Sequence, residues 1–260
     1  MTNSSMWQWR ETEKGRFLTC DLLRNWQHGF FTCHFQGYSP NILVSYLNPN
    51  ASVYRLKQIH SDILFSTATL DSHYLSGADL LEGDGIISSK SLDSVWCASA
   101  DCTPVLIADK GTGGVMAIHS GWRGTSTAIV PKAIALLQSQ GAKLEDLLFA
   151  LGPAIHGKVY QVNEEVAVEV LKTIFPSDTP SELIIEKALQ IENQPILPDE
   201  EENKVRLNVT QVISLQIQQQ GINLNQIAIA PYCTYQTPED FFSYRRTKEK
   251  KIQWSGIVSH

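Results

Sequence analysis

Short apolar and β-branched runs separated by turn residues dominate the first part of the chain. Between Gly15 and about Phe65 their spacing predicts a meander of strands, and Gly83–Ser88 predicts a further short strand. The runs of the meander are Arg16–Leu23, Gly29–Phe35, Asn41–Leu47, Val53–Leu56 and Ile63–Thr67.

Three strongly apolar runs follow, at Ser94–Ala100, Thr103–Asp109 and Gly114–His119. Their nearly continuous hydrophobicity predicts strands buried on both faces, in a central sheet covered by helices or by a second sheet. Leu147–Leu151 and Gln226–Ala230 have the same character and are predicted to be buried strands as well.

Helical periodicity begins only in the second half of the chain. A first helix is predicted to end before Gly141, and Pro131 requires it to begin or bend nearby. Amphipathic patterns predict two more helices at Asn163–Phe175 and Asn208–Gln220. Residues 176–204, with four prolines, are expected to form a surface excursion that contains a short helical or strand piece.

The pattern shows no internal repeat and no linker, so it predicts one α/β or α+β domain over residues 1–260. The 43% hydrophobic content is typical of a globular protein, and the net charge of -6 argues against broad nucleic-acid binding. No run approaches the roughly 18 apolar residues of a membrane span. Five scattered cysteines without a CxxC pair favour a reducing, cytoplasmic setting. The sequence leaves the oligomeric state open.

Candidate chemistry concentrates between Ser99 and Gly124. Cys102 and His119 each stand at the edge of an apolar run, and thiolate and imidazole groups are ligands that zinc prefers. His60, at the end of another strand-like run, is the best candidate for a third ligand. Such a His2Cys set leaves one coordination position open, as catalytic zinc sites do. The separations of 42 and 17 residues match no zinc-finger pattern, so only the fold could unite the three.

Arg123 stands in a Gly-rich turn just before the first predicted helix. There its guanidinium group is placed to hold a phosphate or a carboxylate, with a surface salt bridge as the alternative. For Cys102 the alternative is a small buried apolar side chain. His119 could instead bond only to the backbone.

Six blocks of sequence together point to one family. They are Gln58–His60, Gly83–Gly85, Ala100–Leu106, His119–Gly124, Leu151–Ile155 and Phe241–Arg246. In this combination the chain resembles the YfiH-like proteins, long labelled laccase-domain or multicopper polyphenol oxidases and now regarded as zinc-dependent purine nucleoside phosphorylases. The resemblance extends from about Gly29 to Arg246.

The resemblance implies a mixed β-sandwich flanked by helices, in α/β/β/α layers, and a zinc ion held by His60, Cys102 and His119. It also implies phosphorolysis of adenosine, inosine and S-methyl-5′-thioadenosine, with adenosine deamination beside it. Copper-dependent oxidation of phenols is known for members of the family. This chain has no His-x-His pair, which a true laccase needs, so copper is expected only as an adventitious or side-activity metal.

For a phosphorylase, Arg123 would clamp the phosphate, with Arg245 or Arg246 as helpers. An aromatic side chain, Tyr160 or Phe242, could stack on the purine, although core packing is the alternative for both. A carboxylate, that of Asp101 or Asp84, could orient a ligand imidazole, and Asp101 is the one expected in the catalytic set with Cys102, His119 and Arg123.

Two departures and two rival functions accompany this hypothesis. Family members usually carry Thr-Arg after a His-Gly-Phe block, whereas here Cys33 follows Thr32, so a neighbouring arginine would have to replace any phosphate contact. Many relatives also have a cysteine where Val159 precedes Tyr160. One rival is a cysteine hydrolase or amidase with Cys102 as nucleophile and His119 as base. The other is a binding module in which zinc has only a structural role.

Overall fold

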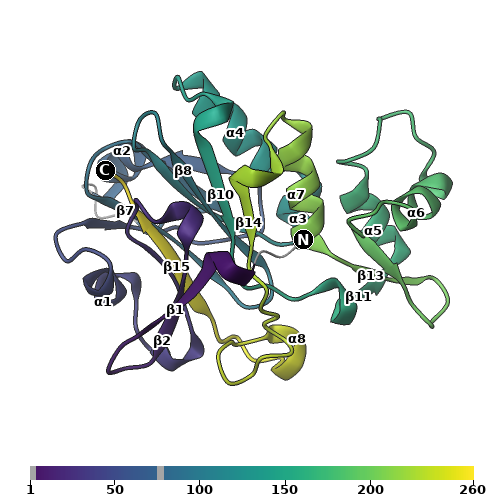
Figure 1. Ribbon diagram of the computed structural model, residues 1–260, viewed down its shortest axis with the longest axis horizontal. Coiled ribbons are helices and arrows are strands. Elements are labelled where there is room, and N and C mark those ends of the chain that lie inside the picture. Colours follow the sequence, from purple (N-terminus) through teal and green to yellow (C-terminus); the bar gives the residue numbers. More distant parts are fainter. Residues whose placement is uncertain (1–3, 75–78) are drawn as a thin grey trace.

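Two six-stranded sheets form the centre of the computed structural model, which describes residues 4–74 and 79–260 (Figure 1). The first sheet has the order β1 (Trp7–Glu11), β2 (Arg16–Cys20), β3 (His28–Phe31), β15 (Gln253–Val258), β7 (Asp93–Ser99) and β4 (Ser52–Tyr54). The second has the order β14 (Ile227–Ile229), β10 (Leu147–Leu151), β8 (Thr103–Asp109), β9 (Val115–Ser120), β6 (Gly85–Ser88) and β5 (Leu64–Ser66).

A third sheet of three short strands and two helices form the side lobe at the right of Figure 1. Its strands are β11 (Gln161–Asn163), β13 (Lys204–Leu207) and β12 (Ile196–Pro198). The helices of the molecule are α1 (Pro40–Leu43), α2 (Thr67–Tyr74), α3 (Trp122–Ser126), α4 (Ile129–Ser139), α5 (Glu164–Leu171), α6 (Ser181–Leu189), α7 (Val209–Gln219) and α8 (Tyr244–Thr247). None of the helices in the described ranges is long and apolar enough to cross a membrane.

Three apolar clusters define the layers. Between the two large sheets lie side chains such as Val95 and Ile257 from the first and Leu106 from the second. A second cluster joins the other face of β8, β9 and β10 to α4, α5 and α7, and a third covers the outer face of the first sheet with α1 and its neighbours. The predicted α/β/β/α sandwich is therefore confirmed, because each large sheet buries one face against the other sheet and one against helical segments.

Most predicted strands are present, but the first part of the chain is not a simple meander. β4 pairs parallel with β7 in the first sheet, and β5 pairs parallel with β6 in the second. The strand predicted at Asn41–Leu47 is wrong: this segment forms helix α1 and a 3-10 turn at Val44–Tyr46. Pro40 occupies the first turn of α1, where its fixed φ and missing N–H favour a helix start over a strand.

Three other predictions were too long. The strand predicted at Arg16–Leu23 ends at Cys20, and a 3-10 turn follows at Asp21–Leu23. The strand predicted at Gly29–Phe35 ends at Phe31 and continues as a 3-10 turn. The helix predicted at Asn163–Phe175 is α5, which ends at Leu171. Helix α4 confirms the expectation for Pro131, because the left-handed residue Ala128 (φ 58°) separates it from α3 and leaves the proline in the first turn. The excursion at 176–204 contains α6 and β12, as predicted.

A buried histidine joins β2 to β3. The Nε2 atom of His28 accepts a hydrogen bond from the Cys20 N–H (2.8 Å), and Nδ1 donates to the Trp26 carbonyl (2.8 Å). This pattern requires the neutral imidazole. Burial accordingly lowers the pKa of His28 to about 4.

We therefore expect an acid-sensitive contribution of His28 to stability. Between pH 6.5 and 4 the unfolded chain takes up a proton that the folded chain does not, so stability falls as pH falls, by about 2 to 3 kcal/mol from pH 7 to 4.5. Urea unfolding of His28→Gln should show a smaller loss over this range than the parent protein. His260→Gln, at an exposed position, is the control, and identical pH dependence in the parent and His28→Gln would contradict the assignment.

Candidate metal centre

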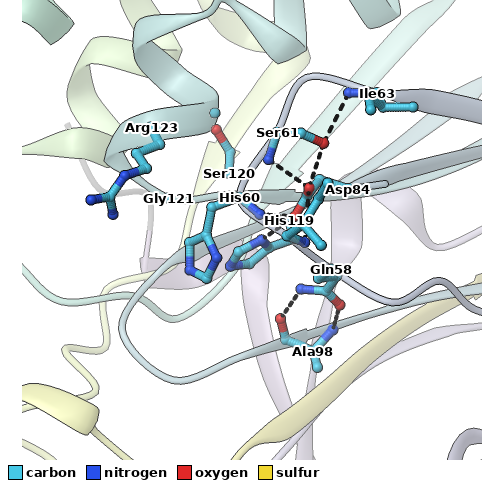
Figure 2. A network of polar contacts seen from close by, with 12 residues as sticks. Gln58, His60, Ser61, Ile63, Asp84, Ala98, His119, Ser120, Gly121 and Arg123 are labelled. Carbon is cyan, nitrogen blue, oxygen red and sulfur yellow. Dashed lines mark hydrogen bonds and ion pairs between the residues drawn. The ribbon is translucent and has the colours of Figure 1, made fainter. Parts of the chain in front are cut away.

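The fold brings the three predicted ligands together. One ligand atom from each of His60, Cys102 and His119 lies within 4.8 Å of the others, and the two imidazole rings meet edge to face with centroids 4.8 Å apart. His60 precedes β5, His119 lies in β9, and Cys102 occupies the link through which the chain passes from β7 in the first sheet to β8 in the second. Figure 2 shows both histidines at this place.

A single buried carboxylate, Asp84, organises two of these ligands (Figure 2). It accepts hydrogen bonds from three consecutive backbone N–H groups, those of Ile59 (3.2 Å), His60 (3.1 Å) and Ser61 (2.6 Å). The Ser61 hydroxyl adds a fourth bond (2.8 Å), and Nδ1 of His119 lies 2.8 Å from Oδ1. With Nδ1 held by Asp84, the Nε2 atom of His119 remains to bind a ligand or metal.

The electrostatics of the cluster favour a thiolate. Burial raises the pKa of Cys102, but the charge and hydrogen bonding of His119 and His60 outweigh it and bring the pKa below its ordinary value. For His119, burial lowers the pKa, whereas the Cys102 thiolate and Asp84 raise it to a greater extent. The same balance acts on Asp84, where burial raises the pKa and the bonds from His119 and Ser61 lower it to about 2. Deprotonated sulfur is the form that binds metal.

Gly121 and Gly124 allow the backbone after β9 to lie close to the neighbouring ligand segments. A Cβ atom at Gly121 would lie 2.7 Å from the Cys102 sulfur, and one at Gly124 would lie 3.2 Å from the Ser61 carbonyl oxygen. These glycines therefore permit the turn between β9 and α3 to lie against the Cys102 segment and the His60 segment. Glycine is needed here for this close approach and not only for the conformation of the turn.

The donor set fits one metal ion. Bonds of about 2.0–2.3 Å to a tetrahedral ion separate its ligands by roughly 3.5 Å, so only small side-chain rotations are needed from the observed spacing. Three protein donors would leave a fourth position for a small molecule.

Sequence reasoning missed one positioning residue, Gln58. Its side-chain amide donates to the Ala98 carbonyl (2.8 Å) and accepts from the Ala98 N–H (2.7 Å), as a neighbouring strand would (Figure 2). It thereby attaches the loop that carries His60 to β7. Its position in the Gln58–His60 block was the available signal.

Of the two carboxylates considered for orienting an imidazole, Asp84 contacts His119 and Asp101 does not. Asp101 accepts hydrogen bonds from the Thr234 hydroxyl (2.7 Å) and the Arg245 backbone N–H (2.7 Å). Its left-handed backbone (φ 95°) turns the carboxylate toward the segment before α8. Asp101 therefore connects the Cys102 turn to the segment that carries Arg245.

The side chains that the sequence predicts to bind phosphate or a purine ring differ in how many contacts they already make within the protein. Arg123 is exposed on α3, its guanidinium carbon 4.3 Å from the Trp122 ring centre, and it forms no salt bridge within the described ranges. Arg245 lies over the Tyr160 ring (4.8 Å) and donates to the Gln161 carbonyl (3.0 Å).

Arg246 lies in α8, and Phe242 lies in the loop just before it. Arg246 donates to the carbonyl groups of Thr234 (2.6 Å), Tyr235 (2.8 Å) and Phe241 (2.6 Å), which commits three of its five N–H donors to the loop. The cationic partner of the Phe242 ring is Lys251, at 6.0 Å. These hydrogen bonds give Arg246 a structural role. The Phe242 ring contacts Lys251 and none of the three predicted metal ligands among the contacts of the described residues.

Cys33, the departure noted in the sequence, faces the segment before α8. Its backbone N–H donates to the Asp240 carbonyl (2.7 Å) and its sulfur lies 3.5 Å from the Glu239 carbonyl. Arg16 is the arginine near Cys33. Its guanidinium group forms two 2.8 Å hydrogen bonds to the buried Asp240 carboxylate. Burial and the Asp240 charge raise the pKa of Cys33, which favours the protonated thiol over the thiolate.

The fold and the site define a two-sheet sandwich protein with a candidate His2Cys metal centre at the crossing between the sheets. The family model described as "Multi-copper polyphenol oxidoreductase laccase" matches residues 41–258, and the chain belongs to this family. The solved structure of YlmD from Geobacillus stearothermophilus has the same fold, with a TM-score of 0.79, 20% identity, and coverage of 97% of this chain and 98% of that one.

Closer sequence relatives carry a different description. A protein of Synechocystis sp. named purine nucleoside phosphorylase is 44% identical over 258 residues, 98% of each chain. Another with that name, from Bacteroides thetaiotaomicron, is 30% identical over 220 residues, 79% of this chain and 76% of its own.

The Asp84 network yields a direct prediction. Asp84→Asn should weaken binding of Zn²⁺ or Co²⁺ by about 10- to 100-fold, because it loses the charge that holds the His119 imidazole and the backbone N–H groups beside His60. Competition against a chromophoric chelator measures this affinity, and thermal unfolding of the metal-free variant monitors folding. Asp109→Asn, at a buried carboxylate at the other end of β8 that bonds to Gly111 and Thr112, is the matched control and should bind metal within a few-fold of the parent; equal losses in the two variants would contradict the assignment.

Proposed function

We propose that this protein is a zinc-dependent purine nucleoside phosphorylase that converts a purine nucleoside and phosphate into free base and ribose 1-phosphate. Adenosine, inosine and S-methyl-5′-thioadenosine are the proposed substrates. The observation that carries the proposal is a cluster of three donors, which would leave a fourth coordination position on a tetrahedral ion, in a chain 44% identical to a named purine nucleoside phosphorylase. Its five cysteines are free, which is consistent with a reducing, cytoplasmic compartment.

Zinc is the metal best suited to one thiolate and two imidazoles, and His60, Cys102 and His119 would hold it. When bound, it would supply a Lewis acid that polarises an oxygen atom of a reactant. Copper rests on the family description alone.

The protein side chains must bind the phosphate dianion and accommodate the positive charge that develops on the ribose. During phosphorolysis the C1′–N9 bond breaks with positive charge on the ribose, and a phosphate oxygen bonds to C1′. Arg123 is the proposed phosphate clamp, because its fork is exposed and unpaired within the described chain. Arg245 would add a second positive charge from α8. Adenosine deamination at the same centre is a secondary activity that we also propose.

A cysteine hydrolase or amidase is the second candidate, and one observation favours it. The Asp84 carboxylate, the His119 imidazole and the Cys102 thiol form the orienting group, base and nucleophile of such an enzyme. The two functions differ in metal dependence, because a nucleophilic cysteine acts without a metal whereas a ligand cysteine does not.

Incubation of the purified protein with inosine or adenosine, with and without phosphate, tests the proposed function. We expect free base together with ribose 1-phosphate only when phosphate is present, and conversion of adenosine to inosine would indicate deamination. Chromatography separates all of these products. Absence of base release from every nucleoside under both conditions would reject the proposal.

Cys102→Ala should lose metal and turnover together, because only two imidazoles remain to hold the ion. Metal analysis and the inosine assay on the same preparation measure both. Cys20→Ala, which removes a buried thiol on β2, is the control. Turnover by a metal-free Cys102→Ala protein would contradict metal-centred chemistry, and turnover by metal-free parent enzyme would favour the hydrolase.

Arg123→Gln should raise the KM for phosphate by roughly 10- to 100-fold, the range for loss of hydrogen bonds to a charged group. The KM for inosine should change much less. Arg10→Gln, at another exposed arginine, serves as the control. An unchanged KM for phosphate in Arg123→Gln would exclude the clamp.

A further inference from the structure

The hydroxyl group of Tyr160 is a polar donor without a partner. Within the part of the chain that the structure describes, this hydroxyl forms no hydrogen bond, although the side chain is half-buried. The backbone of Tyr160 is fixed, because its N–H donates to the Gly157 carbonyl (3.2 Å) and its carbonyl accepts from the Leu207 N–H (2.9 Å). An unused donor on a fixed backbone is available to a bound molecule.

The Tyr160 ring is held on one face. The Arg245 guanidinium carbon lies 4.8 Å from the ring centre, and the guanidinium group is in turn anchored to the Gln161 carbonyl. The Arg245 backbone N–H is bound to Asp101, the residue before Cys102. A continuous set of contacts therefore fixes the ring relative to the metal-ligand turn, and the ring also packs against the apolar cluster that joins the second sheet to α4, α5 and α7.

The charges of the candidate site act on this hydroxyl. Burial raises the pKa of Tyr160 to about 12, and the negative charge of Cys102 also raises it, whereas Arg245 and Arg123 lower it. The phenol therefore keeps its proton at neutral pH. It can donate a hydrogen bond but does not act as a base.

Resting on the proposed phosphorylase function, we propose that Tyr160 is a catalytic residue whose hydroxyl donates a hydrogen bond to N7 of the departing purine. As the C1′–N9 bond breaks, its electron pair stays with the purine, and the imidazole ring of the base shares the negative charge between N9 and N7. A fixed donor at N7 stabilises that charge as it develops. The arrangement assigns Tyr160 to charge stabilisation rather than to base stacking.

The proton balance needs no further reactant. Monohydrogen phosphate loses its proton when its oxygen bonds to C1′, and the released purine gains one proton, passed through water. Tyr160 keeps its own proton throughout. The products are neutral purine and the ribose 1-phosphate dianion.

Tyr160→Phe tests this role, since it removes the hydroxyl and retains the ring beneath Arg245. We expect kcat on inosine to fall by about 100-fold, the usual effect of losing one such donor. On 7-methylinosine the loss should be within about threefold, because methylation blocks N7 and the base departs as a neutral molecule. Metal content and thermal unfolding should match the parent.

Tyr244→Phe, an exposed tyrosine on α8, is the matched control and should retain full activity on both nucleosides. Equal losses of Tyr160→Phe on inosine and 7-methylinosine, or no loss on either, would overturn the role of Tyr160 and leave the phosphorylase proposal intact. A parent protein that phosphorolyses neither nucleoside would overturn both proposals.

Discussion

The buried carboxylate of Asp84 is the constraint on which the candidate site depends. A charge that is 2% exposed is expensive unless it is fully bonded, and here backbone N–H groups, a hydroxyl and an imidazole share that task. The bonds hold the loop of His60 in its left-handed turn (φ 63°) and fix the ring of His119. One anion thus determines where two candidate ligands lie, and the low pKa of its carboxyl keeps it charged.

The third ligand follows from the topology. Because β7 belongs to one sheet and β8 to the other, the chain between them must cross the sandwich, and Cys102 lies at that crossing. Asp101 fixes the crossing from the other side through Thr234 and Arg245. The two aspartates therefore have different roles: Asp84 positions the histidines, and Asp101 connects the Cys102 turn to Thr234 and Arg245.

The sequence predicted best where local pattern and long-range packing agree. The continuous apolar runs of β8 and β10 gave their bounds directly, since both strands are buried on both faces. The short segment after Ser39 was assigned to a strand because its apolar residues outweighed the start signal of Pro40. Strand β15 escaped prediction because its place between β3 and β7 depends on partners more than 150 residues away. Asp101, the neighbour of Cys102 in the sequence, was expected in the catalytic set, whereas only the three-dimensional structure shows that Asp84 is the carboxylate that contacts His119.

The same geometry bears on whether Cys102 is a ligand or a nucleophile. A nucleophilic cysteine needs one base, which His119 with Asp84 would provide. That chemistry does not require a second imidazole, although His60 also helps to lower the pKa of the Cys102 thiol. Yet His60 is held there by a left-handed backbone, a conformation with an intrinsic energetic cost, and by Asp84 and Gln58 around its loop. Structure maintained at that cost is explained by a metal that needs all three donors, so the arrangement of His60 favours a ligand thiolate over a nucleophile.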